Sequence, residues 1–390
     1  MAKIDDSVKK KVPELRFKGF TDEWEERKFA DFIDVKSGKD YKHLNSGSIP
    51  VYGTGGYMLS VDRALSDIDA IGIGRKGTID KPYLLKAPFW TVDTLFYAVP
   101  KQNIDLQFSL SIFKKINWKK FDESTGVPSL SKTVINSVSV SVPSYEEQQK
   151  IGSFFKQLDD TIALHQRKLD LLKEQKKGFL QKMFPKNGAK VPELRFAGFA
   201  DDWEERKLID LATTYIGLVT TMTENYTNKG TLLIRNSDIK EGRFDLSNPI
   251  YLEEQFAEEN KTRRMRKGDV VTVHTGDIGT SAMINSELDG AIGFATITTR
   301  PTKELDSNFL AWYFNSNYHK KYAKRMSTGD GRSNYNMKDF NKNVIPTPQI
   351  DEQQKIGAFF KQLDDTIALH QRKLELLKEQ KKGFLQKMFI

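Results

Sequence analysis

The sequence contains no cysteine, and this absence excludes disulfide bridges and thiolate metal sites. It has no run of about 18 apolar residues, which a membrane-spanning helix would need. A P-loop of the form G-x-x-x-x-G-K-[ST] is absent, and so is the N/D-P-P-[YF] sequence of an amino-methyltransferase. The five histidines are scattered and form no cluster with metal-ligand spacing. We therefore expect a cytoplasmic protein without a membrane segment, a catalytic centre or a metal site.

Two segments of the chain occur twice. Glu147–Phe184 returns as Glu352–Phe389, with 36 of 38 positions identical. A shorter segment, Lys11–Lys28, returns as Lys190–Lys207 with three changes. The residues between the repeated segments show no such similarity, and the second insert is 26 residues longer than the first. The chain is thus two copies of one frame around two different inserts, and we expect function to lie in the inserts.

The long repeat is predicted to be a helix in both copies. It contains no proline, and its glycines lie near its ends. Its apolar residues step by four and three, which is the heptad spacing of a coiled-coil seam. At about 1.5 Å per residue such a helix is roughly 57 Å long. The apolar seam positions are Ile151, Phe155, Leu158, Ile162, Leu169 and Leu172 in the first copy, and Ile356, Phe360, Leu363, Ile367, Leu374 and Leu377 in the second.

A seam of this length must be covered, and its natural cover is the equivalent seam of the other copy. The linker after Phe184 leads into a whole insert, so the connection alone permits either direction. We favour an antiparallel pair, because two like units related by a two-fold axis then carry their inserts at opposite ends. Lys176 and Lys381 occupy polar seam positions, and we expect their ammonium groups to extend into solvent. Asp159 is also expected to be solvated.

The inserts are predicted to be mixed and mostly β, with short strands bounded by Gly, Pro and Asn turns. The second insert also has one amphipathic helical pattern, at Asn308–Arg325. The expected strand regions are Ile49–Tyr57, Ala70–Ile79 and Val134–Val142 in the first insert, and Asp269–Gly279 and Ala291–Ile297 in the second.

These patterns predict an α+β fold with a pseudo-two-fold tandem repeat. Two mixed, mostly-β globular domains would be separated by two long antiparallel coiled-coil helices. The expected parts are a first globular domain with the N-terminal repeated segment (1–146), a first long helix (147–184), a second globular domain with its repeated segment (185–351) and a second long helix (352–390).

One glycine motif lies in the first insert. Gly72–Gly77 matches G-x-G-x-x-G, but a dinucleotide site would need a helix to begin there, and no helical pattern follows. We interpret the motif as a β-turn. Arg75 and Lys76 at its tip would suit a phosphate or a guanine edge, and a solvated basic turn is an equally good interpretation.

The chain is basic, with 61 Lys and Arg against 52 Asp and Glu and a formal net charge of +9. Such a balance favours a polyanionic partner, although many basic proteins bind none. Arg and Asn make two-pronged contacts with guanine and adenine edges, but loops of this composition are often only solvated. The candidate DNA contacts are Arg75, Lys76, Ser131 and Lys132 in the first insert, and Arg235, Asn236, Arg243, Arg332, Asn334 and Asn336 in the second.

Two motifs complete the pattern. P-x-L-R-F-x-G-F-x-x-x-W-x-x-[RK]-K opens each half, at Pro13–Lys28 and Pro192–Lys207. P-x-x-x-E-Q-Q-K-I-G leads into each long helix, at Pro143–Gly152 and Pro348–Gly357. Together with the tandem plan, these motifs make the chain resemble the DNA-specificity subunit of type I restriction-modification systems over essentially its whole length.

The resemblance implies two target-recognition domains that read an asymmetric, two-part site in double-stranded DNA. It also implies partners: two methyltransferase subunits, and restriction subunits that supply a motor and a nuclease. S-adenosylmethionine, ATP and Mg²⁺ would then belong to the partners, with no cofactor bound by this chain. The family's base-contacting residues are not fixed by motif, so none can be carried over to this sequence.

Two other classes of function stay open from the sequence. A tandem protein-binding scaffold, with a coiled coil that acts only as a tether, would have the same plan. A DNA-binding enzyme with an unrecognised active site is the third option. DNA binding in the presence of the methyltransferase subunit separates the scaffold from the specificity subunit.

Overall fold

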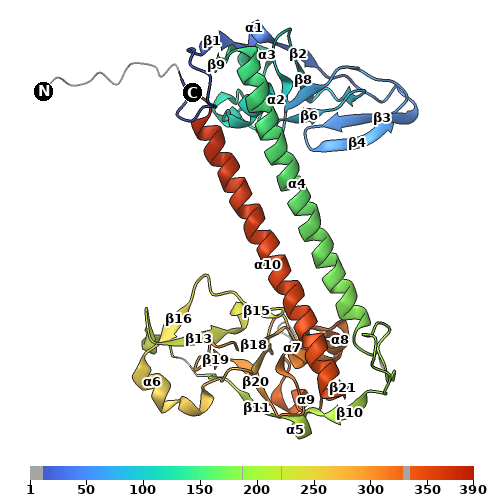
Figure 1. Ribbon diagram of the computed structural model, residues 1–390, viewed down its shortest axis with the longest axis vertical. Helices are drawn as coiled ribbons and strands as arrows, with labels where there is room; N and C mark the ends of the chain where they lie inside the picture. The colour runs from blue at the N-terminus through green and yellow to red at the C-terminus, as the bar shows by residue number, and fades with distance from the viewer. Residues whose placement is uncertain (1–11, 187, 221, 328–333) are drawn as a thin grey trace, which may run out of the picture. The chain divides into compact units, whose positions relative to one another are not determined.

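The computed structural model describes residues 12–186, 188–220, 222–327 and 334–390. The chain divides into two compact units: Met1–Gln166 with Arg372–Ile390 forms unit 1, and Arg167–Gln371 forms unit 2. Each unit contains one insert and a part of each long helix (Figure 1). None of the helices in the described ranges is both long and apolar enough to cross a membrane.

Unit 1 is built on an antiparallel sheet with the strand order β2-β8-β5-β6. A smaller sheet, β4-β3-β7, contains one parallel pair, β3 with β7. The strand β1 of the short repeat pairs with β9, which leads into the long helix. The strands are β1 (Glu25–Lys28), β2 (Ile33–Ser37), β3 (Ser46–Gly53), β4 (Gly56–Val61), β5 (Ala70–Gly74), β6 (Tyr83–Leu85), β7 (Trp90–Thr91), β8 (Leu95–Pro100) and β9 (Ser139–Val142); the helices are α1 (Phe29–Phe32), α2 (Leu106–Lys115), α3 (Lys132–Ser137) and a 3₁₀ turn, η1 (Trp118–Phe121).

Unit 2 has the same plan with additions. Its main sheet, β11-β20-β17-β18, repeats the antiparallel order, and β13 with β19 repeats the parallel pair. The strands are β10 (Glu204–Lys207), β11 (Ala212–Ile216), β12 (Tyr226–Thr227), β13 (Thr231–Arg235), β14 (Ile239–Lys240), β15 (Arg243–Phe244), β16 (Ile250–Leu252), β17 (Val270–Val273), β18 (Ser281–Met283), β19 (Ile292–Phe294), β20 (Thr296–Pro301) and β21 (Val344–Thr347). The helices are α5 (Leu208–Leu211), α6 (Glu254–Glu259), α7 (Ser307–Asn315), α8 (Asn317–Met326) and α9 (Met337–Phe340), with 3₁₀ turns η2 (Thr223–Asn225), η3 (Asn236–Asp238) and η4 (Lys261–Arg263).

The two inserts therefore share one topology although their sequences show no obvious similarity. The strands β2, β8, β5 and β6 of unit 1 correspond in order to β11, β20, β17 and β18 of unit 2. The hairpin β14–β15 and the helix α6 account for part of the greater length of the second insert. The tandem plan extends from the repeated segments into the inserts themselves.

The long helices are α4 (Tyr145–Lys182) and α10 (Ile350–Lys387), and each begins two residues before the predicted start. Every apolar seam position named above is buried or half-buried. Within unit 1 the start of α4 lies beside the end of α10, since the rings of Phe154 and Phe384 are 5.0 Å apart. Within unit 2 the end of α4 lies beside the start of α10, with Phe179 and Phe359 also 5.0 Å apart. The local direction is antiparallel in both units.

The end of each long helix completes the core of the unit in which it lies. Met388 and Phe389 are buried in the core of unit 1, where Phe389 contacts Phe155. Met183 and Phe184 are buried in the core of unit 2. The last residues of the repeat thus act as core residues, beyond the coiled-coil seam.

In each half of the chain, an arginine of the first repeated motif pairs with a glutamate of the second motif at the start of the long helix. Arg16 forms two hydrogen bonds with the carboxylate of Glu147, at 2.8 and 2.7 Å, and Glu147 is almost fully buried. Arg195 and Glu352 make the same pair in unit 2, at 2.7 and 2.8 Å. A two-pronged arginine–carboxylate pair fixes both distance and orientation. The Arg of the first motif therefore aligns the short repeat with the Glu of the second motif.

The glutamine after each of these glutamates joins the long helix to the insert. Gln148 accepts a hydrogen bond from the backbone N–H of Asp105 and donates to the carbonyl of Pro143. Asp105 in turn caps α2 by accepting from the N–H of Phe108. Gln353 repeats these contacts with Asp306 and Pro348. The short helices α2 and α7 are thereby docked on the long helices in the same way (Figure 1).

Several predicted elements differ from the structure. The expected strand regions Ile49–Tyr57 and Ala291–Ile297 each contain parts of two strands, while Ala70–Ile79 and Asp269–Gly279 are strands only over β5 and β17. Val134–Val142 was expected to be a strand, but α3 occupies its first part and only β9 is extended. Ser131 caps α3 by accepting from the N–H of Val134, and this cap outweighs the strand-like alternation of Val and Ser. The single helix expected at Asn308–Arg325 is two helices, because Ser316 is extended and caps α8.

The expectation that Lys176, Lys381 and Asp159 are solvated was wrong. Lys176 pairs with Asp364 at 2.6 Å, and their side chains are only 13% and 20% exposed. Lys381 pairs with Asp159, which also accepts from Lys114 at 2.8 Å. The two pairs join equivalent positions of the repeat: α4 supplies the lysine and α10 the aspartate in unit 2, and the reverse holds in unit 1. A lysine in the seam is thus retained by a facing carboxylate.

The surroundings of these two carboxylates shift their pKa values in opposite directions. Burial raises the pKa of Asp364, and the charge of Lys176 offsets this only in part. Burial also acts to raise the pKa of Asp159, but hydrogen bonds from both Lys114 and Lys381 lower it overall. Asp159 thus accepts from two lysines, whereas Asp364 pairs with one, and the nearby charge of Glu241 also acts to raise the pKa of Asp364.

Candidate nucleic-acid interface

The loop that follows β5 carries two exposed basic residues, Arg75 and Lys76. Its backbone is fixed on both sides, because the N–H of Arg75 donates to Thr94 at 2.8 Å and its carbonyl accepts from Leu130 at 2.9 Å. Lys76 forms an isolated antiparallel bridge with Ser129. Gly72–Gly77 was expected to be a β-turn, but its first half, Gly72–Gly74, belongs to β5; only 75–77 form a bend, which the segment before α3 holds in place.

The four candidate contacts of the first insert line one cleft of about 680 Å³. Arg75 and Lys76 come from the loop after β5, while Ser131 and Lys132 come from the start of α3. Two acidic residues, Asp93 and Glu123, line the same cleft. Sequence reasoning thus selected residues that the fold brings together from positions more than 50 apart in the chain.

The polar groups in this cleft differ in how far they are already engaged. The Arg75 guanidinium lies 5.9 Å from the centroid of the Phe96 ring and donates one hydrogen bond to the Asp93 carbonyl at 3.3 Å. The hydroxyl of Ser131 caps α3, and the backbone N–H of Ser131 donates to the carboxylate of Glu123 at 2.8 Å. Ser131 therefore shapes the loop, whereas Arg75 is exposed and has further N–H groups besides the one that donates to Asp93.

Unit 2 has the equivalent pair of loops. The bridge between Lys76 and Ser129 corresponds to a bridge between Thr275, after β17, and Asn334, before α9. The N–H of Tyr335 donates to the carbonyl of His274 at 2.8 Å, as Leu130 donates to Arg75. Arg75 and His274 thus occupy corresponding positions on the same scaffold with different chemistry.

His274 was not among the residues selected from the sequence. It directly follows the β17 strand, and its side chain is 8% exposed. Its Nδ1 lies 3.0 Å from the Asn334 amide oxygen and 3.2 Å from the Thr275 hydroxyl. Its buried Nε2 has no hydrogen-bond partner among the described residues. The only signal in the sequence is its place after a β-rich run, and sequence alone does not give its burial.

Two further candidates of the second insert, Arg235 and Asn236, lie at the end of β13 and in η3. Arg235 forms a two-pronged pair with Asp238 and also donates to the Asn248 carbonyl. Asn236 donates to the carbonyl of Ala295 at 2.8 Å. The guanidinium of Arg235 and the amide of Asn236 therefore stabilise the β13–η3 turn.

Three further candidates complete the second insert. Arg243 is exposed in β15, where its charge acts to lower the pKa of Asp364. Asn336 caps α9 by accepting from the N–H of Asp339 at 2.9 Å. Arg332 lies outside the described residues. Asn334 is thus the exposed candidate that the structure places on the loop pair.

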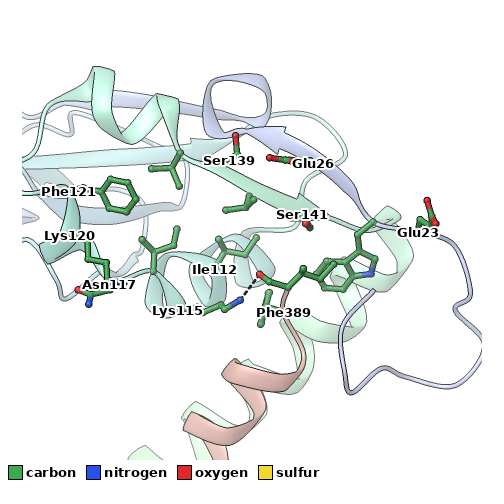
Figure 2. A pocket seen from close by; sticks show the side chains of 15 residues that line it. Glu23, Glu26, Ile112, Lys115, Asn117, Lys120, Phe121, Ser139, Ser141 and Phe389 are labelled. Carbon is green, nitrogen blue, oxygen red and sulfur yellow. Dashed lines mark hydrogen bonds between the residues drawn. The ribbon is translucent and has the colours of Figure 1, made fainter. Parts of the chain in front are cut away.

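A second cavity in unit 1, of about 730 Å³, is lined mainly by apolar side chains. Figure 2 shows Ile112, Phe121 and Phe389 around it, with Lys115 donating a hydrogen bond of 2.6 Å to the carbonyl of Ile390. Burial lowers the pKa of Lys115. Among the described residues, no group of three or more His, Asp or Glu side chains could hold a metal ion.

Comparison with known proteins agrees with this architecture. The family model of the type I restriction modification DNA specificity domain matches residues 21–174 and 200–379. The chain belongs to this family. The two matched stretches include most of both inserts and most of both long helices.

Individual specificity subunits and one solved structure are also similar to this chain. The chain is 21% identical over 330 residues to the type I restriction enzyme MjaVIII specificity subunit of Methanocaldococcus jannaschii, covering 82% of this chain and 75% of the relative. It is 25% identical over 166 residues to the EcoBI specificity subunit of Escherichia coli, covering 42% and 35%. The crystal structure of a type I S subunit from M. genitalium has a TM-score of 0.70 at 15% identity and covers 97% and 99% of the two chains. The predicted fold with two domains of mixed helix and sheet is confirmed.

Proposed function

We propose that this chain is the non-catalytic, DNA-specificity subunit of a type I restriction-modification complex. Its membership of the specificity-domain family supports this function. The main structural support is that the two inserts share one topology but carry different residues on equivalent loops, with Arg75 and Lys76 in one and His274 and Thr275 in the other. Two similar scaffolds with different tips suit a DNA site made of two unlike halves.

The long helices suit the role of a spacer between these halves. The contacts of α4 with α10 run antiparallel inside each unit, and the pairs Lys176–Asp364 and Lys381–Asp159 join equivalent positions of the two copies of the repeat. In our proposal the pair of helices holds the two recognition domains apart as a rod. Half-sites read from one side of a duplex are spaced by about 34–36 Å per helical turn, which a helix of roughly 57 Å can span.

In this proposal the chemistry belongs to partner subunits. Methyltransferase subunits, which use S-adenosylmethionine, would modify adenines at the site that this chain selects. Restriction subunits, which use ATP and Mg²⁺, would cleave the DNA. The basic surface of this chain would add attraction to phosphates without regard to sequence, and this part of the affinity should fall steeply with salt.

Exchange of one insert tests the proposed function. Residues 208–351 would be replaced by the insert of another family member, and methylated adenines would be mapped in a genome that carries the complete system. We expect a two-part methylated sequence in which one half changes while the other half and the rest of the pattern persist. The matched control replaces residues 29–146 and should change only the opposite half. A methylated sequence that stays the same after either exchange, or a change in both halves from one exchange, would contradict the proposal.

A further inference from the structure

The loop after β5 is a rigid platform for a single arginine. Arg75 is fixed through its own N–H and carbonyl, to Thr94 and Leu130, and Gly77 is fixed through its N–H to Pro128 at 2.8 Å. Gly77 has a φ of +98°, a conformation that favours glycine and lets the chain turn back directly after the two basic residues. The backbone beneath Arg75 is therefore set before any ligand binds.

The side chain of Arg75 is also partly oriented. The Phe96 ring lies beneath the guanidinium, and one Nη1–H points to the Asp93 carbonyl. A guanidinium has five N–H donors, so this single long hydrogen bond leaves a donor edge available. Unlike Arg235, whose guanidinium is held in two prongs by Asp238, Arg75 forms no ion pair with a carboxylate within the described residues. Arg75 is thus an exposed arginine of the cleft whose guanidinium is not bound by a carboxylate of the described residues.

The neighbours of Arg75 are suited to a nucleic-acid backbone. Lys76 is exposed beside it, and Lys132 lines the same cleft. Lysine acts as a point charge toward phosphate, whereas the planar fork of arginine matches the O6 and N7 acceptors of guanine in the major groove. The cleft thus combines one fork with two positive point charges, beside the acidic residues Asp93 and Glu123.

We propose that Arg75 reads a guanine in one half of the DNA site, and that Lys76 and Lys132 bind the phosphates beside it. This assignment rests on the proposed function and names the residue that determines specificity in the first recognition domain. In unit 2 the corresponding position is the buried His274, which cannot present such a fork. The same scaffold therefore reads a different base pattern in the second half, and the asymmetry of the site follows from this substitution.

The experiment uses the full chain in complex with its methyltransferase subunits. Mapping of methylated adenines gives the two-part target, and duplexes that change one base pair of the target at a time are then compared by equilibrium binding. For the wild-type complex, one G·C pair in the half read by residues 29–146 should be preferred by about 5- to 150-fold. In Arg75→Ala this preference should fall to within about two-fold, while preferences at every position of the other half persist.

Two further variants separate base reading from loss of charge. Arg75→Lys keeps the positive charge but lacks the fork, so the guanine preference should fall while the salt dependence of binding stays as in the wild type. Lys132→Ala, from the same cleft, should weaken binding to all duplexes alike and reduce the salt slope by about one, with base preferences unchanged.

Several results would overturn the assignment. One is an Arg75→Ala variant that binds all duplexes more weakly but keeps every preference, because the residue would then contact only phosphate. Another is a first half-site without a G·C pair, and a third is a change of preference in the second half. Each of these leaves the specificity-subunit function standing, whereas a wild-type complex without any sequence preference would remove that function itself.

Discussion

Gly152, in the first turns of α4, gives a prediction whose sign can be worked out from the structure. A Cβ at this position would lie 2.2 Å from the Asp105 carboxylate and 2.8 Å from the N–H nitrogen of Phe108. Both atoms belong to the capped start of α2, so Gly152→Ala must displace the cap or separate the two helices. Overpacking of this kind costs about 1–3 kcal/mol, and loss of the Asp105 cap adds about 1 kcal/mol.

The gain in helix propensity opposes this cost. Replacing glycine by alanine inside a helix stabilises it by about 1 kcal/mol. The net expectation for Gly152→Ala is a loss of about 1–3 kcal/mol in the free energy of unfolding of unit 1. For a domain of this size, each kcal/mol corresponds to a shift of about 2–4 °C in the melting temperature. Differential scanning calorimetry of the full chain should therefore show a decrease of about 2–12 °C for the transition of unit 1.

Gly383, on α10 in the same unit, is the matched control. Apart from its own helix, no atom of the described residues lies within 4 Å of a Cβ at this position, so Gly383→Ala gains helix propensity without a clash. The melting temperature should rise by about 2–4 °C. The two alanine variants must therefore shift the transition in opposite directions. A rise for Gly152→Ala would show that α2 does not pack on the long helix as described.

Two other predictions concern buried charge and pH. Arg16→Ala leaves the carboxylate of Glu147 buried without its partner, and it should lower the free energy of unfolding by about 3–5 kcal/mol. The control Lys36→Ala removes one partner of an exposed pair and should change the free energy of unfolding by less than about 1 kcal/mol. Equal effects of the two variants in urea unfolding would refute the role of the buried pair. Burial lowers the pKa of His319 to about 4, below the value near 6.5 that it has in the unfolded chain. The stability that depends on neutral His319 is therefore complete above pH 6.5 and is lost as the pH falls toward 4. The wild type should lose about 3 kcal/mol more than His319→Gln between pH 7 and pH 4, and parallel pH profiles would show that His319 does not titrate in this way.

The sequence predicted those parts of the fold that depend on local, repeated spacing. The heptad pattern located both long helices to within two residues at their starts, because helix formation over ten turns is set by many positions at once. It did not reveal that Ser131 and Ser316 begin new helices, since a single capping hydroxyl can outweigh the pattern of several neighbours. Caps of one residue are weak signals until the packing around them is known.

The candidate site was only partly predictable for a related reason. Arg75, Lys76, Ser131 and Lys132 were selected by residue type, and the structure places all four on one cleft. The same criterion selected Arg235, which is committed to Asp238 in the β13–η3 turn. Residue type says what a side chain could bind, but only tertiary contacts show whether its hydrogen-bonding groups are already used.

Inside unit 1 the start of α4 contacts the end of α10, and inside unit 2 the end of α4 contacts the start of α10. Each end of the repeated helix therefore has to fit the opposite end of the other copy. A change at Asp159 in one copy, for example, removes a partner from Lys381, which lies in the other copy. The two copies are thus coupled at both ends of the long helices. This coupling gives a physical reason why the long helices agree at 36 of 38 positions while the inserts share a topology but no obvious sequence similarity.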